Sequence, residues 1–239
     1  MEIIQKISEK NKDIYQAKPV TIAFLGDSVT QGCFECYFDD NGVQTVFDSK
    51  SAYPMRVKEI LNLLYPSTQI NIINSGISGD NAPNGNERFD RDVAPYSPDL
   101  VVVSFGLNDA CKGKSNVSLY TQALKNIFEK VKRLNAECIF VFQNMMNTKV
   151  SCHLKDEREQ NLAKNFAAIQ NRGDVEYYCE KAKETAKECG VAFCGMYTAW
   201  KKMYENGVDT TELLSNKYNH PLREFHYYIA IKIIEKMFE

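Results

Sequence analysis

Glycine-flanked polar residues follow three of the short apolar runs in the sequence. The first is Gly26–Gly32 (GDSVTQG), where glycines on both sides of Ser28 let the backbone turn tightly and keep the approach to the hydroxyl clear. A serine presented in this way has what a nucleophile needs, so nucleophilic attack by Ser28 is the chemistry that the segment indicates. The alternative is an ordinary turn in which Asp27 or Ser28 caps the next helix.

A serine nucleophile needs a base near neutral pH, and the sequence holds only three histidines. His220 lies on a loop immediately before the last expected helix, and Pro221 suits the first turn of that helix. His226 falls inside the helix and His153 in a mid-chain loop, so we expect both to be surface or packing residues. His220 is therefore the candidate base for Ser28.

Two further segments offer hydrogen-bond donors for an oxyanion. The glycines of Asn74–Asn81 (NSGISGDN) let the backbone turn N–H groups toward a ligand, and Gly79 is the candidate donor. In Gly106–Asp109 (GLND), the carboxamide of Asn108 is the candidate for a second donor. Taken singly, Gly79 also fits an ordinary loop and Asn108 an ordinary helix cap.

The segments between these motifs alternate between short β-branched apolar runs and longer amphipathic stretches, which is typical of βαβ units. The expected strands are residues 20–25, 69–73, 100–105, 138–142 and 191–194. The expected helices are 1–15, 51–64, 118–134, about 155–189 with a break near Gly173, and 222–238. The sequence predicts a three-layer α/β/α sandwich with a central parallel sheet of about five strands, whose ligands bind outside the carboxyl ends of the strands.

An insertion at about residues 33–50 separates the first strand from its helix. Within it, Asp40-Asn41-Gly42 lies between aromatic and β-branched residues and predicts a hairpin turn. No repeat or linker divides the chain, so we expect one domain over 1–239 with this hairpin beside the site. The aromatic residues of the insertion would either line a pocket or pack the hairpin onto the body: Phe34, Tyr37, Phe38 and Phe47.

Composition and charge exclude several classes of protein. The 239 residues are 44% hydrophobic, which is enough for one sizeable core, and the net charge of −2 gives no broad attraction to nucleic acid or anionic membranes. No apolar run approaches the roughly 20 residues that span a bilayer. Charges interrupt the N-terminal segment MEIIQKISEKNKDIYQ, so we expect no signal peptide and a cytoplasmic location.

The eight cysteines are expected to be reduced thiols in such a location. Cys33 and Cys36 have the CxxC spacing of a redox pair or of half a zinc site. Cys189 and Cys194 would make a poor second half, so we predict no metal. The motifs GxSxG, GxxxxGK[ST] and GxGxxG are absent, which disfavours the α/β-hydrolase elbow and the usual phosphate-binding loops.

The segments GDSVTQG, NSGISGD and GLND, and the NHP before the final helix, occur together in this order. In this respect the chain resembles the SGNH hydrolase superfamily, also called GDSL-like lipases or esterases, over residues 26–221. The resemblance implies a flavodoxin-like SGNH fold and a serine that attacks an ester carbonyl while a histidine takes its proton. It assigns these roles to Ser28 and His220. The resemblance also implies an oxyanion hole made by the N–H groups of Ser28 and Gly79 and the side chain of Asn108, and it implies no cofactor.

One position departs from the family pattern, which has an aspartate three residues before the histidine to orient the imidazole. Here that position is Lys217, and a cation cannot replace the acid. Three alternatives follow: a neutral acceptor orients the ring, a carboxylate substitutes, or the enzyme is impaired. The neutral acceptor, which we favour, would be the Asn216 side chain or a backbone carbonyl of residues 215–217, and the carboxylate would be Asp209 or Glu212.

The leading functional hypothesis is hydrolysis of a carboxylic ester, with an acetyl or short acyl group on a sugar or other small alcohol as substrate. A non-catalytic binding module that kept the fold is the alternative that Lys217 keeps open. An acyltransferase would use the same acyl-enzyme and pass the acyl group to an alcohol instead of water.

Overall fold

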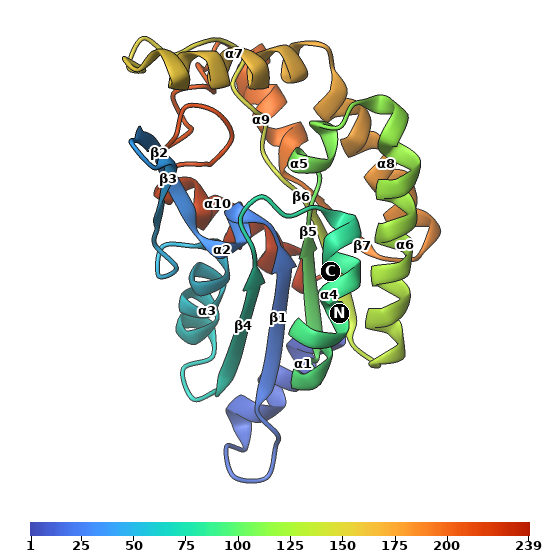
Figure 1. The fold of residues 1–239 in the computed structure, drawn as a ribbon. Coiled ribbons are helices and arrows are strands. Elements are labelled where there is room, and N and C mark those ends of the chain that lie inside the picture. The colour runs from blue at the N-terminus through green and yellow to red at the C-terminus, as the bar shows by residue number, and fades with distance from the viewer.

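A five-stranded parallel sheet forms the middle layer of the computed structural model, which describes residues 1–239. Its strands, in the spatial order β4-β1-β5-β6-β7, are β4 (Ile70–Gly76), β1 (Val20–Gly26), β5 (Leu100–Ser104), β6 (Glu137–Phe142) and β7 (Ala192–Gly195). Every neighbouring pair is parallel. The carboxyl ends of the strands therefore meet at one edge, the upper edge of the sheet in Figure 1.

Helices cover both faces of the sheet, because successive side chains of each strand point into different cores. In β5, Val101 and Val103 belong to one core, whereas Leu100 and Val102 belong to the other. The first core is closed by α4 (Ala82–Asp92), α6 (Val117–Arg133) and α8 (Asp174–Glu188). The second is closed by α1 (Glu2–Lys12), α3 (Tyr53–Leu64) and α10 (Arg223–Met237).

The remaining elements lie largely around the carboxyl edge of the sheet. They are the short helices α2 (Ser28–Gln31) and α5 (Leu107–Ala110), the helices α7 (Glu157–Asn171) and α9 (Met196–Glu205), and the 3-10 turn η2 (Lys114–Asn116). The 3-10 turn η1 (Ala94–Tyr96) instead comes shortly before β5, at the opposite edge. Helix α7 crosses above this edge in Figure 1. None of the helices combines the length and apolar character needed to cross a membrane.

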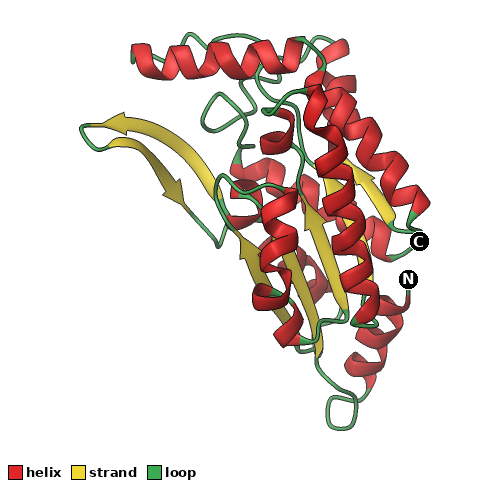
Figure 2. Cartoon of the chain, turned by 45° about the vertical axis from the view of Figure 1, so that its right-hand side comes forward, coloured by secondary structure: helices red, strands yellow, loops and turns green.

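The predicted hairpin is present and projects from the body as a two-stranded antiparallel ribbon (Figure 2). It consists of β2 (Cys33–Asp39) and β3 (Gly42–Phe47), with Asp39 paired to Gly42 across the turn. Gly42 has a φ of 103°, a conformation that favours glycine and explains its place after Asp40 and Asn41. The base of the ribbon is closed by the N–H of Asp48, which donates to the carbonyl of Gly32 at 2.8 Å.

The predicted sandwich and its five strands are confirmed, with bounds that differ by a few residues. Helices α4 and α9 were not expected. The sequence of α4 is polar and contains glycine at position 85, both of which weaken a helical pattern. The structure explains that glycine, because a Cβ at Gly85 would clash with the ring of Phe105, which is fully buried behind the carboxyl end of β5.

We predict that Phe105→Ala lowers the free energy of unfolding by about 3–5 kcal/mol, because the emptied volume beside Gly85 cannot be refilled by nearby backbone. Urea denaturation would measure the change. Leu63→Ala is the matched control, since Leu63 is 81% exposed and its truncation should change stability by no more than about 0.5 kcal/mol. Equal effects of the two substitutions would contradict the core described here.

Candidate active site

Ser28 lies at the carboxyl end of β1, where the chain turns sharply into α2. The side chain of Asp27 caps this helix by accepting the N–H of Val29 at 3.0 Å, and the same oxygen accepts Nε2–H of Gln143 at 2.7 Å. Burial raises the pKa of Asp27 to about 7. These bonds hold the turn in the conformation that presents Ser28. Ser28 itself is only 4% exposed.

The imidazole of His220 faces Ser28. Its Nε2 lies 3.0 Å from Oγ of Ser28, and its Nδ1 lies 3.0 Å from the main-chain carbonyl oxygen of Phe34 in the hairpin. A carbonyl oxygen can only accept, so the nitrogen that faces it must carry the hydrogen. Nδ1–H therefore donates to Phe34, and Nε2 is left to accept the hydroxyl hydrogen of Ser28, as a general base requires.

The His220 ring is buried, and this burial lowers the pKa of the imidazole to about 4, despite the opposing effects of the Phe34 carbonyl and the charge of Glu35. The ring is thus neutral near pH 7, which is the form that accepts a proton. The thiol Sγ of Cys36 is the other polar atom near Nδ1, at 4.0 Å.

The structure does not place Asn216 on the imidazole ring, contrary to the expectation from the sequence. Its Oδ1 accepts the backbone N–H groups of Tyr218, Asn219 and His220, each at 3.0 Å. Asn216 therefore shapes the loop that carries His220. The acceptor that faces Nδ1 is neutral, but it is the carbonyl of Phe34, so the expectation of the Asn216 side chain or a carbonyl of residues 215–217 was wrong. Sequence spacing could not indicate Phe34, because the hairpin is distant along the chain.

Lys217 and the candidate carboxylates lie elsewhere in the loop. Nζ of Lys217 lies 3.0 Å from a carboxylate oxygen of Glu212, whose other oxygen accepts Oγ–H of Ser151 at 2.6 Å. Asp209 pairs with Lys149 at 2.6 Å. Neither carboxylate bonds to the imidazole, and the Lys217 cation is engaged by Glu212.

The two expected oxyanion donors follow β4 and β5 at the same edge of the sheet. Gly79 has a φ of 78° on an exposed turn, and its N–H donates to no group of the protein. Asn108 stands in α5, and its Nδ2 donates one hydrogen to the carbonyl of Asp80 at 2.8 Å. That bond ties the Asn108 carboxamide to the Gly79 turn and leaves its second N–H for a ligand.

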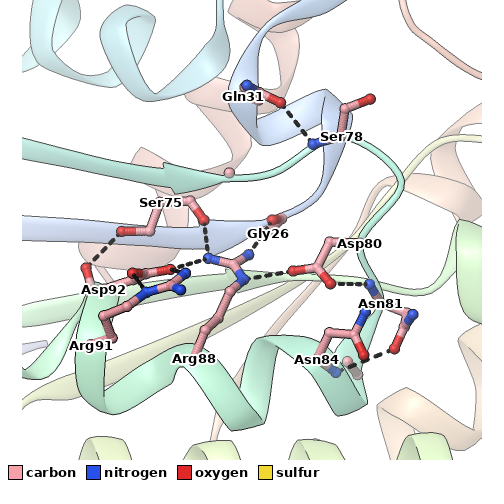
Figure 3. A network of polar contacts seen from close by, with 12 residues as sticks. Gly26, Gln31, Ser75, Ser78, Asp80, Asn81, Asn84, Arg88, Arg91 and Asp92 are labelled. Atoms are coloured by element: carbon pink, nitrogen blue, oxygen red, sulfur yellow. Dashed lines mark hydrogen bonds and ion pairs between the residues drawn. The ribbon is translucent and has the colours of Figure 1, made fainter.

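Arg88 on α4 holds the Gly79 turn against the end of β1, as Figure 3 shows. Its Nε donates to Asp80 at 2.6 Å, and its two Nη groups donate to the carbonyls of Ser75 and Gly26 at 2.7 and 2.8 Å. Arg88 is 8% exposed, and its charge is paired with the carboxylates of Asp80 and Asp92. Sequence reasoning missed this residue, because an arginine on a polar helix carries no local sign of burial.

The other histidines lie outside this arrangement. His226 is fully buried in α10, and its Nδ1 accepts the N–H of Tyr53 at 3.0 Å. His153 is exposed, with Nε2 3.6 Å from Glu212. Both positions agree with the surface or packing roles expected from the sequence.

All eight cysteines are free thiols, including Cys33 and Cys36 on β2. No group of three or more histidine, cysteine, aspartate or glutamate side chains is arranged to hold a metal ion. Burial raises the pKa of Cys33 to about 11, so its thiol stays protonated near neutral pH.

The sequence model of the GDSL-like lipase/acylhydrolase family matches residues 24–226. The chain therefore belongs to this family of ester hydrolases, which confirms the resemblance seen in the motifs. The matched residues run from β1 to the first turn of α10 and so include every residue of the arrangement around Ser28.

Acetyl esterases are among the relatives. An acetylxylan esterase of Geobacillus stearothermophilus is 31% identical over 88 residues, which cover 37% of this chain and only 39% of that protein's length. A catalytic mutant of Axe2, an acetylxylan esterase from the same organism, has a similar structure with a TM-score of 0.65 and 20% identity, covering 91% of this chain and 94% of that one.

A two-domain esterase active on acetylated mannans is similar over 98% of this chain and 52% of its own, with a TM-score of 0.67 and 18% identity. At such identities the structural matches confirm the α/β/α fold.

We predict that His220 titrates well below the ordinary histidine value of 6.5, near the value of about 4 that burial gives it. Because the folded pKa is the lower one, the neutral ring contributes stability that is fully present above pH 6.5 and lost as the pH falls through about 4. NMR titration of the imidazole Cε1–H resonance, assigned by its loss in His220→Gln, measures the midpoint. A midpoint at or above 6.5 would contradict a buried, neutral base.

Proposed function

We propose that the protein is a serine esterase that removes an acetyl or short acyl group from a sugar or other small alcohol through an acyl-enzyme on Ser28. The observation that carries the proposal is the relay from Oγ of Ser28 to Nε2 of His220 and from Nδ1 to the Phe34 carbonyl, both at 3.0 Å. The acetylxylan and acetylated-mannan esterases among the relatives favour an acetylated carbohydrate as substrate.

In the proposed reaction, Oγ of Ser28 attacks the ester carbonyl while its proton passes to Nε2 of His220. The N–H groups of Ser28 and Gly79 and the free N–H of Asn108 stabilise the tetrahedral oxyanion. His220 then gives the proton to the departing alkoxide, which leaves as the alcohol. In the second half, His220 takes a proton from water as the water attacks the acyl carbonyl, and His220 then returns this proton to Oγ of Ser28 as the carboxylic acid leaves.

We predict that Ser28→Ala abolishes hydrolysis of p-nitrophenyl acetate, because no covalent intermediate can form. His220→Ala should lower kcat by about 10²–10⁴-fold and Asn108→Ala by about 10²–10³-fold, the usual contributions of a general base and of one oxyanion donor. Acetylated xylo-oligosaccharides and p-nitrophenyl butyrate, assayed alongside, define the substrate. Wild-type rates in the Ser28 variant would disprove the assignment.

We predict that Lys217→Met keeps kcat/KM within about fivefold of the wild-type value, because the Lys217 cation pairs with Glu212 at 3.0 Å and makes no contact with the imidazole of His220. The same ester assay makes the measurement. A loss as large as that of Asn108→Ala would mean that Lys217 acts on the imidazole directly.

A further inference from the structure

Arg223 fastens both ends of the hairpin to the first turn of α10. Its Nη1 and Nη2 donate to the two carboxylate oxygens of Glu35, the second at 3.0 Å, and its Nε donates to Asp48 at 3.0 Å. Glu35 lies near the start of β2, and Asp48 directly follows β3. A single guanidinium therefore joins the two strands at the base of the ribbon.

The same guanidinium packs on the residue whose carbonyl orients His220. The Arg223 Cζ lies 4.2 Å from the centre of the Phe34 ring. The centre of the His226 ring lies 4.8 Å from the centre of the Phe34 ring. Phe34 is fully buried between these groups of α10. Its side chain is held by packing while its neighbour Glu35 is held by a two-point hydrogen bond, so the peptide between them has little freedom to rotate.

The position of Arg223 in the chain adds a second constraint. It is the first residue of α10 and stands three residues after His220. The imidazole and the guanidinium that binds the hairpin therefore belong to one short segment. Any shift of the hairpin base relative to α10 would move the Phe34 carbonyl away from Nδ1 of His220.

We propose that Arg223 is a positioning residue of the esterase, which holds the Phe34 carbonyl on His220 through Glu35 and Asp48 and so lets the hairpin replace the missing acid. Arg223 does not touch the substrate in this role. It sets the orientation of the base through the hairpin. The inference rests on the proposed esterase function, and the two are tested separately below.

The test measures the reactivity of Ser28 without relying on recognition of an ester substrate. A fluorophosphonate probe reacts when Oγ of Ser28 displaces fluoride from phosphorus and the serine proton passes to His220, so its rate reports the orientation of the base. Intact-protein mass spectrometry follows this rate, and p-nitrophenyl acetate hydrolysis gives kcat and KM for the same samples. All measurements are made below the unfolding temperature of every variant.

Arg223→Met should lower the phosphonylation rate and kcat together by about 10- to 100-fold, the scale expected when a catalytic group is misplaced, with KM changed by less. Arg223→Lys keeps the charge but loses the two-point geometry, so it should fall between Arg223→Met and the wild type. Glu35→Gln weakens the two-point hydrogen bond with Arg223 from the hairpin side. This variant replaces Arg223→Met in the test if Arg223→Met does not fold.

Arg158 provides the matched control. It is also an arginine that holds the hairpin, with Nη1 donating to the carbonyl of Asp39 at 3.2 Å and Cζ 5.0 Å from the ring of Phe38, but it acts at the tip of the ribbon. Arg158→Met should leave the rate of Ser28 labelling and kcat at wild-type values.

Each outcome separates the two proposals. A wild-type protein whose Ser28 does not react with the probe would overturn the proposed function itself. If the wild type reacts and Arg223→Met or Glu35→Gln reacts equally fast, or loses only affinity for the ester through KM, the function stands and the positioning role is overturned. A loss in Arg158→Met as large as that in Arg223→Met would also overturn it.

Discussion

The hydrogen bond from Nδ1 of His220 to the main-chain carbonyl of Phe34 joins two segments that stand 186 positions apart in the chain. Because the carbonyl can only accept, this bond selects the tautomer in which Nε2 faces Ser28 as a hydrogen-bond acceptor, the form that the proposed general base requires. The hairpin that supplies the carbonyl, the start of α10 and the loop shaped by Asn216 all have to be in place for it to form. The site is therefore a property of the assembled fold.

A neutral carbonyl does only part of what a carboxylate does beside a catalytic histidine. It fixes the ring and the tautomer, but it carries a partial charge and stabilises the imidazolium less. Burial further lowers the pKa of His220 to about 4. The charge of Glu35 acts in the opposite direction on that pKa, and Glu35 is the residue that Arg223 binds at two points. In the family pattern, one aspartate both orients the imidazole and supplies a negative charge. In the proposed esterase, the Phe34 carbonyl orients the ring and the neighbouring Glu35 carboxylate supplies the charge.

The sheet and the candidate residues have local signatures in the sequence, and the structure brings Ser28 and His220 together. The strands were recognisable because both faces of the sheet are buried, and Ser28, Gly79, Asn108 and His220 stand in short motifs at strand or loop ends. The Phe34 acceptor could not be predicted, since every residue has a carbonyl and its place depends on how the hairpin packs on α10. For the same reason the buried role of Arg88 became visible only in the folded chain, where its donors meet the ends of β1 and β4.

Nitrogen-15 NMR of the His220 imidazole near pH 7 tests the central bond most directly. We expect a neutral ring with the proton on Nδ1, a coupling from Nδ1 to the ¹³C-labelled carbonyl of Phe34, and an Nε2 shift typical of an unprotonated, hydrogen-bond-accepting nitrogen. A proton found on Nε2, or a ring that is already charged at this pH, would show that the Phe34 carbonyl does not orient His220.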